Sequence, residues 1–292
     1  SLGILSVIGD SERNIREITE ERSRETHEKA APFRRFSYDR IPLDDPSTYR
    51  MFRAGAAVGT FQFESAAQMN LAVLLEPEHF EDLVASVALI RPGPIRGNVV
   101  SRFVACRNGW ARADVLHPAL RETLAKTYGC IVFQEQVNDV VAVMTGCTEA
   151  EADKFRKSLT RRAKLDSMDD AREEFVRKAM ARHPDLDHER AHALFDQIEG
   201  WSGYGFTEGH AASFALTGYR TGYLSVHHTA PYFAGMMNHQ PMGYYTTNTL
   251  AGEARRRGVR ILPVDINSSQ DKSFAPDSAS IRLGLRIVAE LR

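Results

Sequence analysis

The densest cluster of charge in this sequence lies near its middle. Six cations fall within eleven residues and no acid separates them: Lys154, Arg156, Lys157, Arg161, Arg162 and Lys164. Residues three and four apart share a helix face. A helix over this segment would therefore align four of these cations along one stripe, with Arg156 beside it: Lys154, Lys157, Arg161 and Lys164. Arginine and lysine bind phosphate oxygens and displace the counterions of nucleic acids. The row therefore fits a nucleotide or a nucleic acid, although an ordinary solvated helix face remains the alternative.

A glycine-rich segment, GYGFTEGH at 203–210, is the second candidate for ligand binding. Glycines let a backbone approach a ligand closely, and Tyr204, Phe206 and His210 carry rings that could stack on a base or a sugar. A helix follows at once, and helix N-termini attract anions. The glycine spacing and the absence of a preceding strand exclude a dinucleotide-binding fingerprint. A plain loop between two core helices explains the segment equally well.

The polar triplet Gln134-Glu135-Gln136 stands between the apolar run CIVF (130–133) and an apolar helix. Amides that become buried need hydrogen-bond partners. A ligand or a template strand could supply those partners, and so could a network internal to the protein. The sequence leaves both possibilities open.

Carboxylates and thiols offer little for catalysis. Asp185 and Asp187, within HPDLDHER, form the best-spaced acidic pair, but they lie on a polar turn before a helix, where aspartate is usual as an N-cap. Cys106 has no neighbouring histidine, so we do not expect a nucleophilic thiol. We therefore predict no catalytic residue and no metal site within this chain.

Hydrophobic periodicity predicts helices through most of the chain. One buried helical face is formed by Phe80, Leu83, Val84 and Val87. Further helices are expected near 118–127, over 211–227 and over 247–257. Strand-like alternation occurs only near 260–266 and in the last residues, and the run 130–133 could be a strand or the start of a helix. The predicted fold is mainly α, with a small β-containing C-terminal segment.

Composition excludes several protein classes. The chain has 292 residues, 43% of them hydrophobic and 26% charged, which is typical of a globular protein and excludes collagen-like or disordered chains. Because 37 Lys and Arg oppose 38 Asp and Glu, the net charge of −1 gives no overall attraction to nucleic acid or membrane. No apolar run approaches the roughly 20 residues of a membrane span. Three isolated cysteines fit neither a disulfide framework nor a zinc site, so we expect a reducing, cytoplasmic location.

The order of the sequence blocks resembles one protein family. The blocks are IPLDDPSTYRMF, VGTFQFES, FEDLVASVALIRPGP, YGCIVFQEQV, ADKFRKSL, GYGFTEGHAASFAL and RILPVDIN. In this order, over nearly the whole chain, they resemble the bacterial DNA polymerase III alpha subunit, a C-family polymerase. NHQPMGYY and EGHAASFA are closer to its error-prone, damage-inducible branch than to the main replicase.

The resemblance implies a domain arrangement. Residues 1–40 would be a helix and linker following the palm domain, 41–267 the helical fingers domain, and 268–292 the start of the little finger. In this family the palm holds the carboxylates for two Mg²⁺ ions. The Mg²⁺ ligands would therefore lie outside this chain, which alone would be catalytically inactive.

The resemblance also assigns site residues. In the family the fingers present cations to the triphosphate of the incoming dNTP. Arg156 and Lys157 match a pair of arginines, and lysine here keeps the charge but loses the bidentate fork. Arg161, Arg162 and Lys164 match a lysine trio approximately. The ring residues Tyr204, Phe206 and His210 match the family's YGFNKSH, in which Glu208 of this chain replaces a lysine. Three further residues match positions near the closing site: Arg91, Gln134 and Gln136.

The implied function is the fingers portion of a DNA-directed DNA polymerase, a nucleotidyltransferase. It would bind the incoming dNTP and the DNA template-primer during replication or damage-tolerant synthesis. The sliding clamp and other polymerase subunits would bind other regions of the polymerase. The alternative is a non-catalytic accessory fragment that binds nucleic acid.

Overall fold

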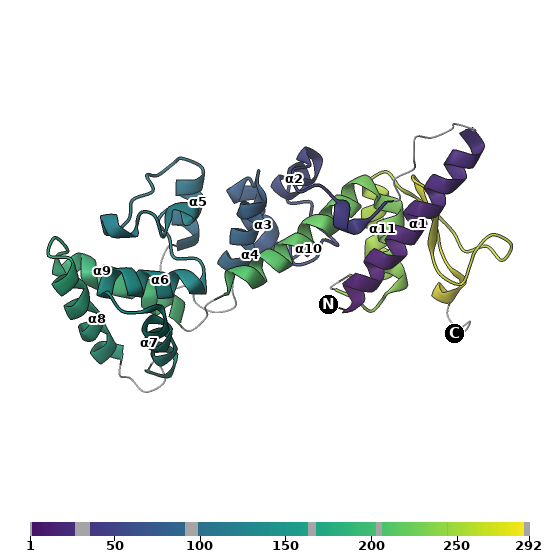
Figure 1. Cartoon of the computed structure of the whole chain (residues 1–292). Coiled ribbons are helices and arrows are strands. Elements are labelled where there is room, and N and C mark those ends of the chain that lie inside the picture. Colours follow the sequence, from purple (N-terminus) through teal and green to yellow (C-terminus); the bar gives the residue numbers. More distant parts are fainter. Residues whose placement is uncertain are drawn as a thin grey trace. The chain divides into compact units, whose positions relative to one another are not determined.

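A computed structural model describes residues 2–26, 36–90, 99–162, 168–202, 206–243 and 245–288 (Figure 1). The chain forms two compact units. The first comprises residues 1–73, 77–80 and 215–292, and the second comprises 74–76 and 81–214. The described residues are mostly helical and carry a small sheet near the C-terminus, so the predicted fold class is confirmed.

The first unit combines helices with the sheet. Its helices are α1 (Leu2–Thr26), α2 (Pro46–Arg53), most of α3 (Ala66–Leu75), the C-terminal part of α10 (Glu208–His227), α11 (Thr229–Asn238) and α12 (Thr247–Arg256), with the 3-10 turns η1 (Tyr38–Arg40) and η4 (Leu285–Ile287). Helix α1 packs on α11. Its spacing explains this, because Ile4, Val7, Ile8 and Ile15 are buried along one face.

The sheet has three short strands. They are β1 (Arg260–Leu262), β2 (Phe274–Asp277) and β3 (Ser280–Arg282), in the order β1-β3-β2. β1 runs parallel to β3 with Ile261 opposite Ile281, and β2 runs antiparallel to β3 with an irregular register. Buried Ile281 and Ala275 show that one face of this sheet joins the core formed with α11.

Helix α10 passes close to the loop after α2. Gly218 allows this approach, because a Cβ at that position would lie 2.4 Å from Phe63 Cε2 and 2.8 Å from the Phe61 carbonyl oxygen. The hydroxyl of Tyr219 accepts a hydrogen bond from the backbone N–H of Asp45 at 2.8 Å. Asp45 in turn caps α2 by accepting from Thr48 N at 2.7 Å, as an aspartate directly before a helix usually does.

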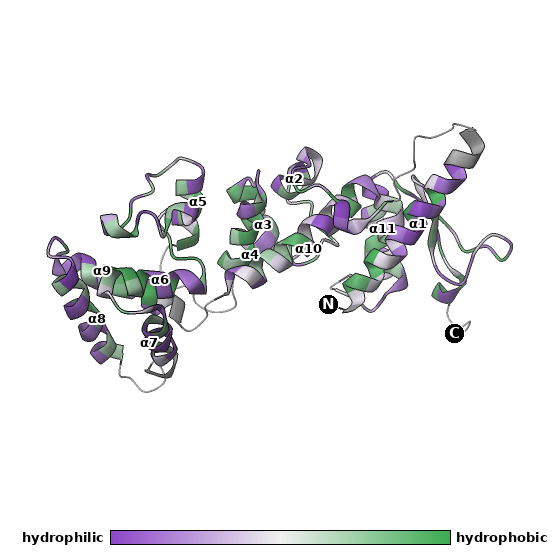
Figure 2. Ribbon diagram, in the orientation of Figure 1, coloured by the Kyte–Doolittle hydropathy of each residue, from purple (hydrophilic) through white to green (hydrophobic). Residues whose placement is uncertain are grey.

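The described residues of the second unit form helices joined by loops, without a strand. Its elements are α4 (Phe80–Leu89), α5 (Val99–Arg107), η2 (Pro118–Leu120), η3 (Ala125–Thr127), α6 (Gln134–Thr145), α7 (Glu149–Arg162), α8 (Met168–Arg182), α9 (His188–Ser202) and the first turns of α10. α6 to α9 share one core, which includes Val137, Leu159, Phe175 and Phe195. Figure 2 shows apolar and hydrophilic residues sharing these helices, as amphipathic packing requires.

Two local expectations are corrected. The helix expected near 118–127 is two separate 3-10 turns, η2 and η3, and Tyr128 then adopts a left-handed conformation at φ 54° that ends η3. The run 130–133 is neither strand nor helix. It is a buried extended segment that leads into α6. None of the described helices is long and apolar enough to cross a membrane.

Candidate functional site

Two of the predicted site segments meet at the N-terminus of α6. The backbone N–H of Gln134 donates to the carbonyl oxygen of Phe206 at 3.0 Å. Beside this bond, the N–H of Glu208 donates to Glu135 Oε2 at 3.0 Å. Both bonds satisfy groups that a helix terminus leaves without an intrahelical partner. The structure therefore brings Gln134 and Phe206 together, although 72 positions separate them in the sequence.

The rings of this segment contact one another. The ring centroids of Phe206 and His210 are 5.1 Å apart, and those of His210 and Phe214 are 4.2 Å apart. His210 is exposed, whereas Phe206 is half-buried. Of these two predicted site residues, only His210 presents an exposed ring.

Glu208 has a partner that sequence reasoning missed. Lys126 Nζ lies 2.7 and 2.6 Å from the two carboxylate oxygens of Glu208. The acid that replaces the family's lysine is therefore paired with a lysine from the η3 turn. No pattern in the sequence could have shown this, since the two residues are 82 positions apart.

The first five cations of the run lie on α7, and two of them, Arg156 and Lys157, are paired with an acid. Arg156 Nη2 lies 2.7 Å from Asp153 Oδ1, and Arg156 Nε donates to Asn138 Oδ1 of α6 at 3.2 Å. Lys157 Nζ lies 2.6 Å from Asp153 Oδ2. Hydrogen bonds from Lys157 and then Arg156 lower the pKa of the Asp153 carboxyl. Asp153 directly precedes the run, three and four residues before Arg156 and Lys157. This helical spacing could have predicted both ion pairs from the sequence.

Gln136 is the centre of a buried hydrogen-bond network. Its Oε1 accepts from the backbone N–H groups of Val132 and Phe133 at 2.9 and 3.0 Å. Its Nε2 donates to Thr127 Oγ1 at 2.7 Å, and Thr127 donates onward to the Cys130 carbonyl at 2.6 Å. Of the two possibilities that the sequence left open, the structure shows the internal network for this amide.

Acidic groups lie beside the cations. Burial, followed by the nearby Glu149 carboxylate, raises the pKa of Asp139 on α6, while Lys126 opposes the rise. Glu135 and Glu208 add to it. The N-terminal half of α6 is therefore not a uniformly cationic surface, whereas Lys154 and Lys157 are exposed on α7.

Several predicted site residues are not described by the structure. Arg91, Lys164 and Tyr204 lie outside the described residues. Arg161 and Arg162 belong to α7, but their side chains are not described. Their assigned roles stay predictions.

The two aspartates expected to be caps differ. Asp187 caps α9 by accepting from Arg190 N at 2.8 Å, as predicted. Asp185 does not cap this helix; its Oδ2 lies 3.2 Å from His117 Nε2, so the capping interpretation is wrong for it. His117 was not singled out in the sequence, because it is 68 positions away.

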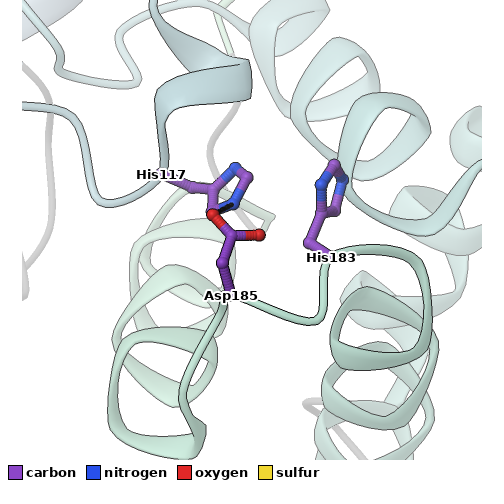
Figure 3. Close-up of side chains that lie close together, drawn as sticks. All are labelled: His117, His183 and Asp185. Carbon is purple, nitrogen blue, oxygen red and sulfur yellow. Dashed lines mark hydrogen bonds and ion pairs between the residues drawn. The ribbon is translucent and has the colours of Figure 1, made fainter.

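Histidines gather around Asp185. One ligand atom from each of His117, His183 and Asp185 lies within 4.8 Å of the others (Figure 3). Next to them on α9, His188 Nε2 and His192 Nε2 are 3.2 Å apart. The spacing H-E-x-x-H at 188–192 could have revealed this second pair from sequence.

Comparison with known proteins settles the family. Residues 7–183 match the model of the bacterial DNA polymerase III alpha subunit finger domain. The chain belongs to this family. The matched part of the finger domain includes α6, α7 and most of the second unit.

The relatives of this finger domain carry a consistent name. This chain is 45% identical over 273 residues to the error-prone DNA polymerase of Symbiobacterium thermophilum, and the match covers 86% of this chain and 25% of that protein. It is 39% identical over 249 residues to that of Dechloromonas aromatica (85% and 24%) and 40% over 263 residues to that of Rhodopirellula baltica (88% and 23%). The resemblance to the error-prone branch is confirmed. The chain spans about a quarter of the length of these relatives.

Proposed function

We propose that this chain acts as the fingers of a DNA-directed DNA polymerase and binds the incoming dNTP and the template-primer. The observation that carries the proposal is the finger-domain match over residues 7–183, which includes the cationic helix α7. The names of the relatives support it, since each is called an error-prone DNA polymerase.

Phosphate groups are the proposed ligands of α7. Lys154 and Lys157 are exposed on it, and Arg156 is anchored against α6. An incoming phosphate would compete with Asp153 for Arg156 and Lys157, because a carboxylate and a phosphate accept the same charge-assisted hydrogen bonds. Before the nucleotide binds, the Asp153 carboxylate thus holds the side chains of both cations in position.

The ring of His210 is the proposed nucleotide-stacking group among the described residues. It is exposed and supported by Phe206 and Phe214 on either side. The bonds of Gln134 and Glu135 to the 206–208 segment fix the start of α10 against α6. The ring of His210 therefore stands on a backbone that α6 supports rather than on a free loop.

Magnesium chemistry is proposed to come from outside this chain. The group of His117, His183 and Asp185 does not fit Mg²⁺, since two of its three ligand atoms are nitrogen and Mg²⁺ takes oxygen. We propose that palm carboxylates of a longer polymerase hold Mg²⁺ and that the chain alone does not join nucleotides. Binding of the sliding clamp and other subunits by other regions is part of the same proposal.

Salt-dependent DNA binding tests the phosphate role. Fluorescence anisotropy of a labelled primer-template is measured with the whole chain over a series of salt concentrations. The double variant Lys154→Gln/Lys157→Gln should lower the slope of log K against log salt by about 0.9 for each phosphate that the two lysines no longer neutralise. Lys178→Gln is the matched control, because Lys178 is an exposed lysine of the same unit that pairs with Glu174. Equal slopes for all three proteins would contradict the proposal.

Two further arms separate the alternatives. Adding the complementary dNTP with Mg²⁺ should strengthen binding relative to a mismatched dNTP if the chain contributes to nucleotide selection. A non-catalytic accessory fragment would bind DNA without any response to the dNTP. Primer extension by the chain alone should give no incorporation, and any incorporation would contradict the proposed division of labour.

A further inference from the structure

Three side chains from separate segments converge at one corner of the second unit. His117 precedes the η2 turn, His183 directly follows α8, and Asp185 lies in the turn before α9. Their ligand atoms all lie within 4.8 Å of one another, and the two imidazole centroids are 4.5 Å apart. Figure 3 shows the carboxylate of Asp185 beside the ring of His117, with the ring of His183 further to the right.

The ring of His183 is oriented as metal-binding imidazoles usually are. Its Nε2 lies 3.2 Å from the carbonyl oxygen of Val143, which can only accept, so the ring proton is on Nε2. That leaves the lone pair of Nδ1 free for a cation. A hydrogen bond from the non-ligating nitrogen to a carbonyl is the usual way in which a protein fixes the tautomer and orientation of a histidine ligand.

Without a metal, a hydrogen bond joins His117 to Asp185 at the position that the ion would occupy. His117 Nδ1 accepts from the backbone N–H of Ala119 at 3.2 Å, so its proton is on Nε2, which donates to Asp185 Oδ2 at 3.2 Å. A metal at Nε2 would displace that proton through solvent to Nδ1, with no net proton released. The bond from Ala119 would then break, and the metal would take the place of the proton between the ring and the carboxylate.

The distances and ligand types point to one class of ion. Two imidazole nitrogens and one carboxylate oxygen are typical of zinc-class sites that leave a fourth position for water. With bonds of roughly 2.0 to 2.2 Å, tetrahedral ligand atoms lie roughly 3.4 Å apart. The His117–Asp185 distance already matches this spacing. The other ligand pairs lie within 4.8 Å, so they must approach by up to about 1.4 Å to reach this spacing. The Asp185 side chain is 70% exposed and can move toward the rings.

We propose that His117, His183 and Asp185 bind a divalent transition metal of the zinc class. Bound there, the ion joins the turn before η2 to the connection between α8 and α9. The ion would therefore have a structural role, by cross-linking these two connections, and it would be separate from the cations of α7.

A second pair of histidines, His188 and His192, could bind the same metal ion instead. Both lie on α9, and their Nε2 atoms, 3.2 Å apart, could chelate an ion without any help from Asp185. Any test must therefore distinguish the two groups. Cys147 is half-buried and is a further soft ligand that a metal could find.

The experiment is calorimetric titration of Zn²⁺ into the metal-free whole chain, together with Co²⁺ absorption spectra. The proteins are the parent, Asp185→Asn, His183→Gln and the double variant His188→Gln/His192→Gln. We expect one ion per chain in the parent, at least tenfold weaker binding in Asp185→Asn and His183→Gln, and unchanged binding in the double variant. Circular dichroism without metal shows whether each variant is folded, and Asp185→Asn changes a mostly exposed side chain and should fold.

Other outcomes overturn the proposal. These are no binding by the parent, loss of binding only in His188→Gln/His192→Gln, or a thiolate-to-Co²⁺ charge-transfer band. NMR of the His117 ring gives an independent readout. Zn²⁺ should move the proton from Nε2 to Nδ1, whereas a ring that only supports the turn would keep its proton on Nε2.

Discussion

Arg156 and Asp153 form a salt bridge within α7, with Nη2 of the arginine 2.7 Å from Oδ1 of the aspartate. The same guanidinium donates through Nε to Asn138 of α6, and only 11% of the Arg156 side chain is exposed. Lys157 shares Asp153 but is 68% exposed. Two neighbouring cations that look equivalent in the sequence are therefore a helix–helix contact and a surface charge.

Replacing these two cations should separate their roles. Arg156→Ala removes the hydrogen bond to Asn138, which contributes about 1 kcal/mol, together with the packing of the arginine stem. Lys157→Ala should lower the free energy of unfolding much less, because its side chain is mostly solvated. Urea denaturation monitored by circular dichroism measures both. Equal destabilisation of the two variants would show that Arg156 is not a structural contact.

The amide of Gln136 should be essential for the segment that leads into α6. Gln136→Ala leaves two buried backbone N–H groups without an acceptor, so we expect a decrease of about 2 to 3 kcal/mol in the free energy of unfolding. Gln134→Ala is the matched control, because the bond from Gln134 to Phe206 uses the backbone and survives the substitution. A Gln136→Ala protein as stable as the control would disprove the role of this network.

Two glycines of α10 should respond in opposite directions to the same change. Gly218→Ala places a methyl group against Phe63 and the Phe61 carbonyl, so it should destabilise the protein by about 1 to 3 kcal/mol. Gly209→Ala meets no atom within 4 Å and should stabilise the helix by up to about 1 kcal/mol. Thermal melting of both variants checks the pair. Stabilisation by Gly218→Ala would show that α10 does not approach this loop as closely as described.

His228 should make stability depend on pH. Burial, helped by the neighbouring His227, lowers its pKa to about 4, and its ring packs edge-on against Phe36 with centroids 4.8 Å apart. Between pH 6.5 and 4 the unfolded chain thus binds more protons at this position than the folded chain. The contribution is complete above about pH 6.5 and is lost as the pH falls toward 4, by at most about 1.4 kcal/mol per pH unit.

The measurement is urea denaturation of the parent and His228→Gln at about pH 7.5 and about pH 4.5, on either side of the ordinary histidine pKa. Glutamine carries no proton to bind in this range, so the variant should lose less stability between the two pH values. The same loss in both proteins would mean that the ring is already protonated, or solvated, in the folded state.

The sequence predicted local structure correctly where the residues of a single segment determine it. The pattern Thr148-x-x-Glu151 predicts a reciprocal capping box, and the structure has it. Thr148 N donates to Glu151 Oε2 at 2.8 Å, and Glu151 N donates to Thr148 Oγ1 at 3.3 Å. The mainly helical class and the family could be predicted in the same way, because periodicity, caps and motif order are all features of the linear sequence. The domain boundaries after residues 40 and 267 stay predictions.

The partners of the polar residues were decided by the tertiary structure alone. Gln136, Asp185 and Glu208 are visible as polar residues in the sequence, but each could face a ligand, a solvent shell or another segment. Folding placed Thr127, His117 and Lys126 beside them, from 9, 68 and 82 positions away. The physical reason is that helix packing is set by apolar faces, and the polar groups brought together by that packing leave no periodic trace in the sequence.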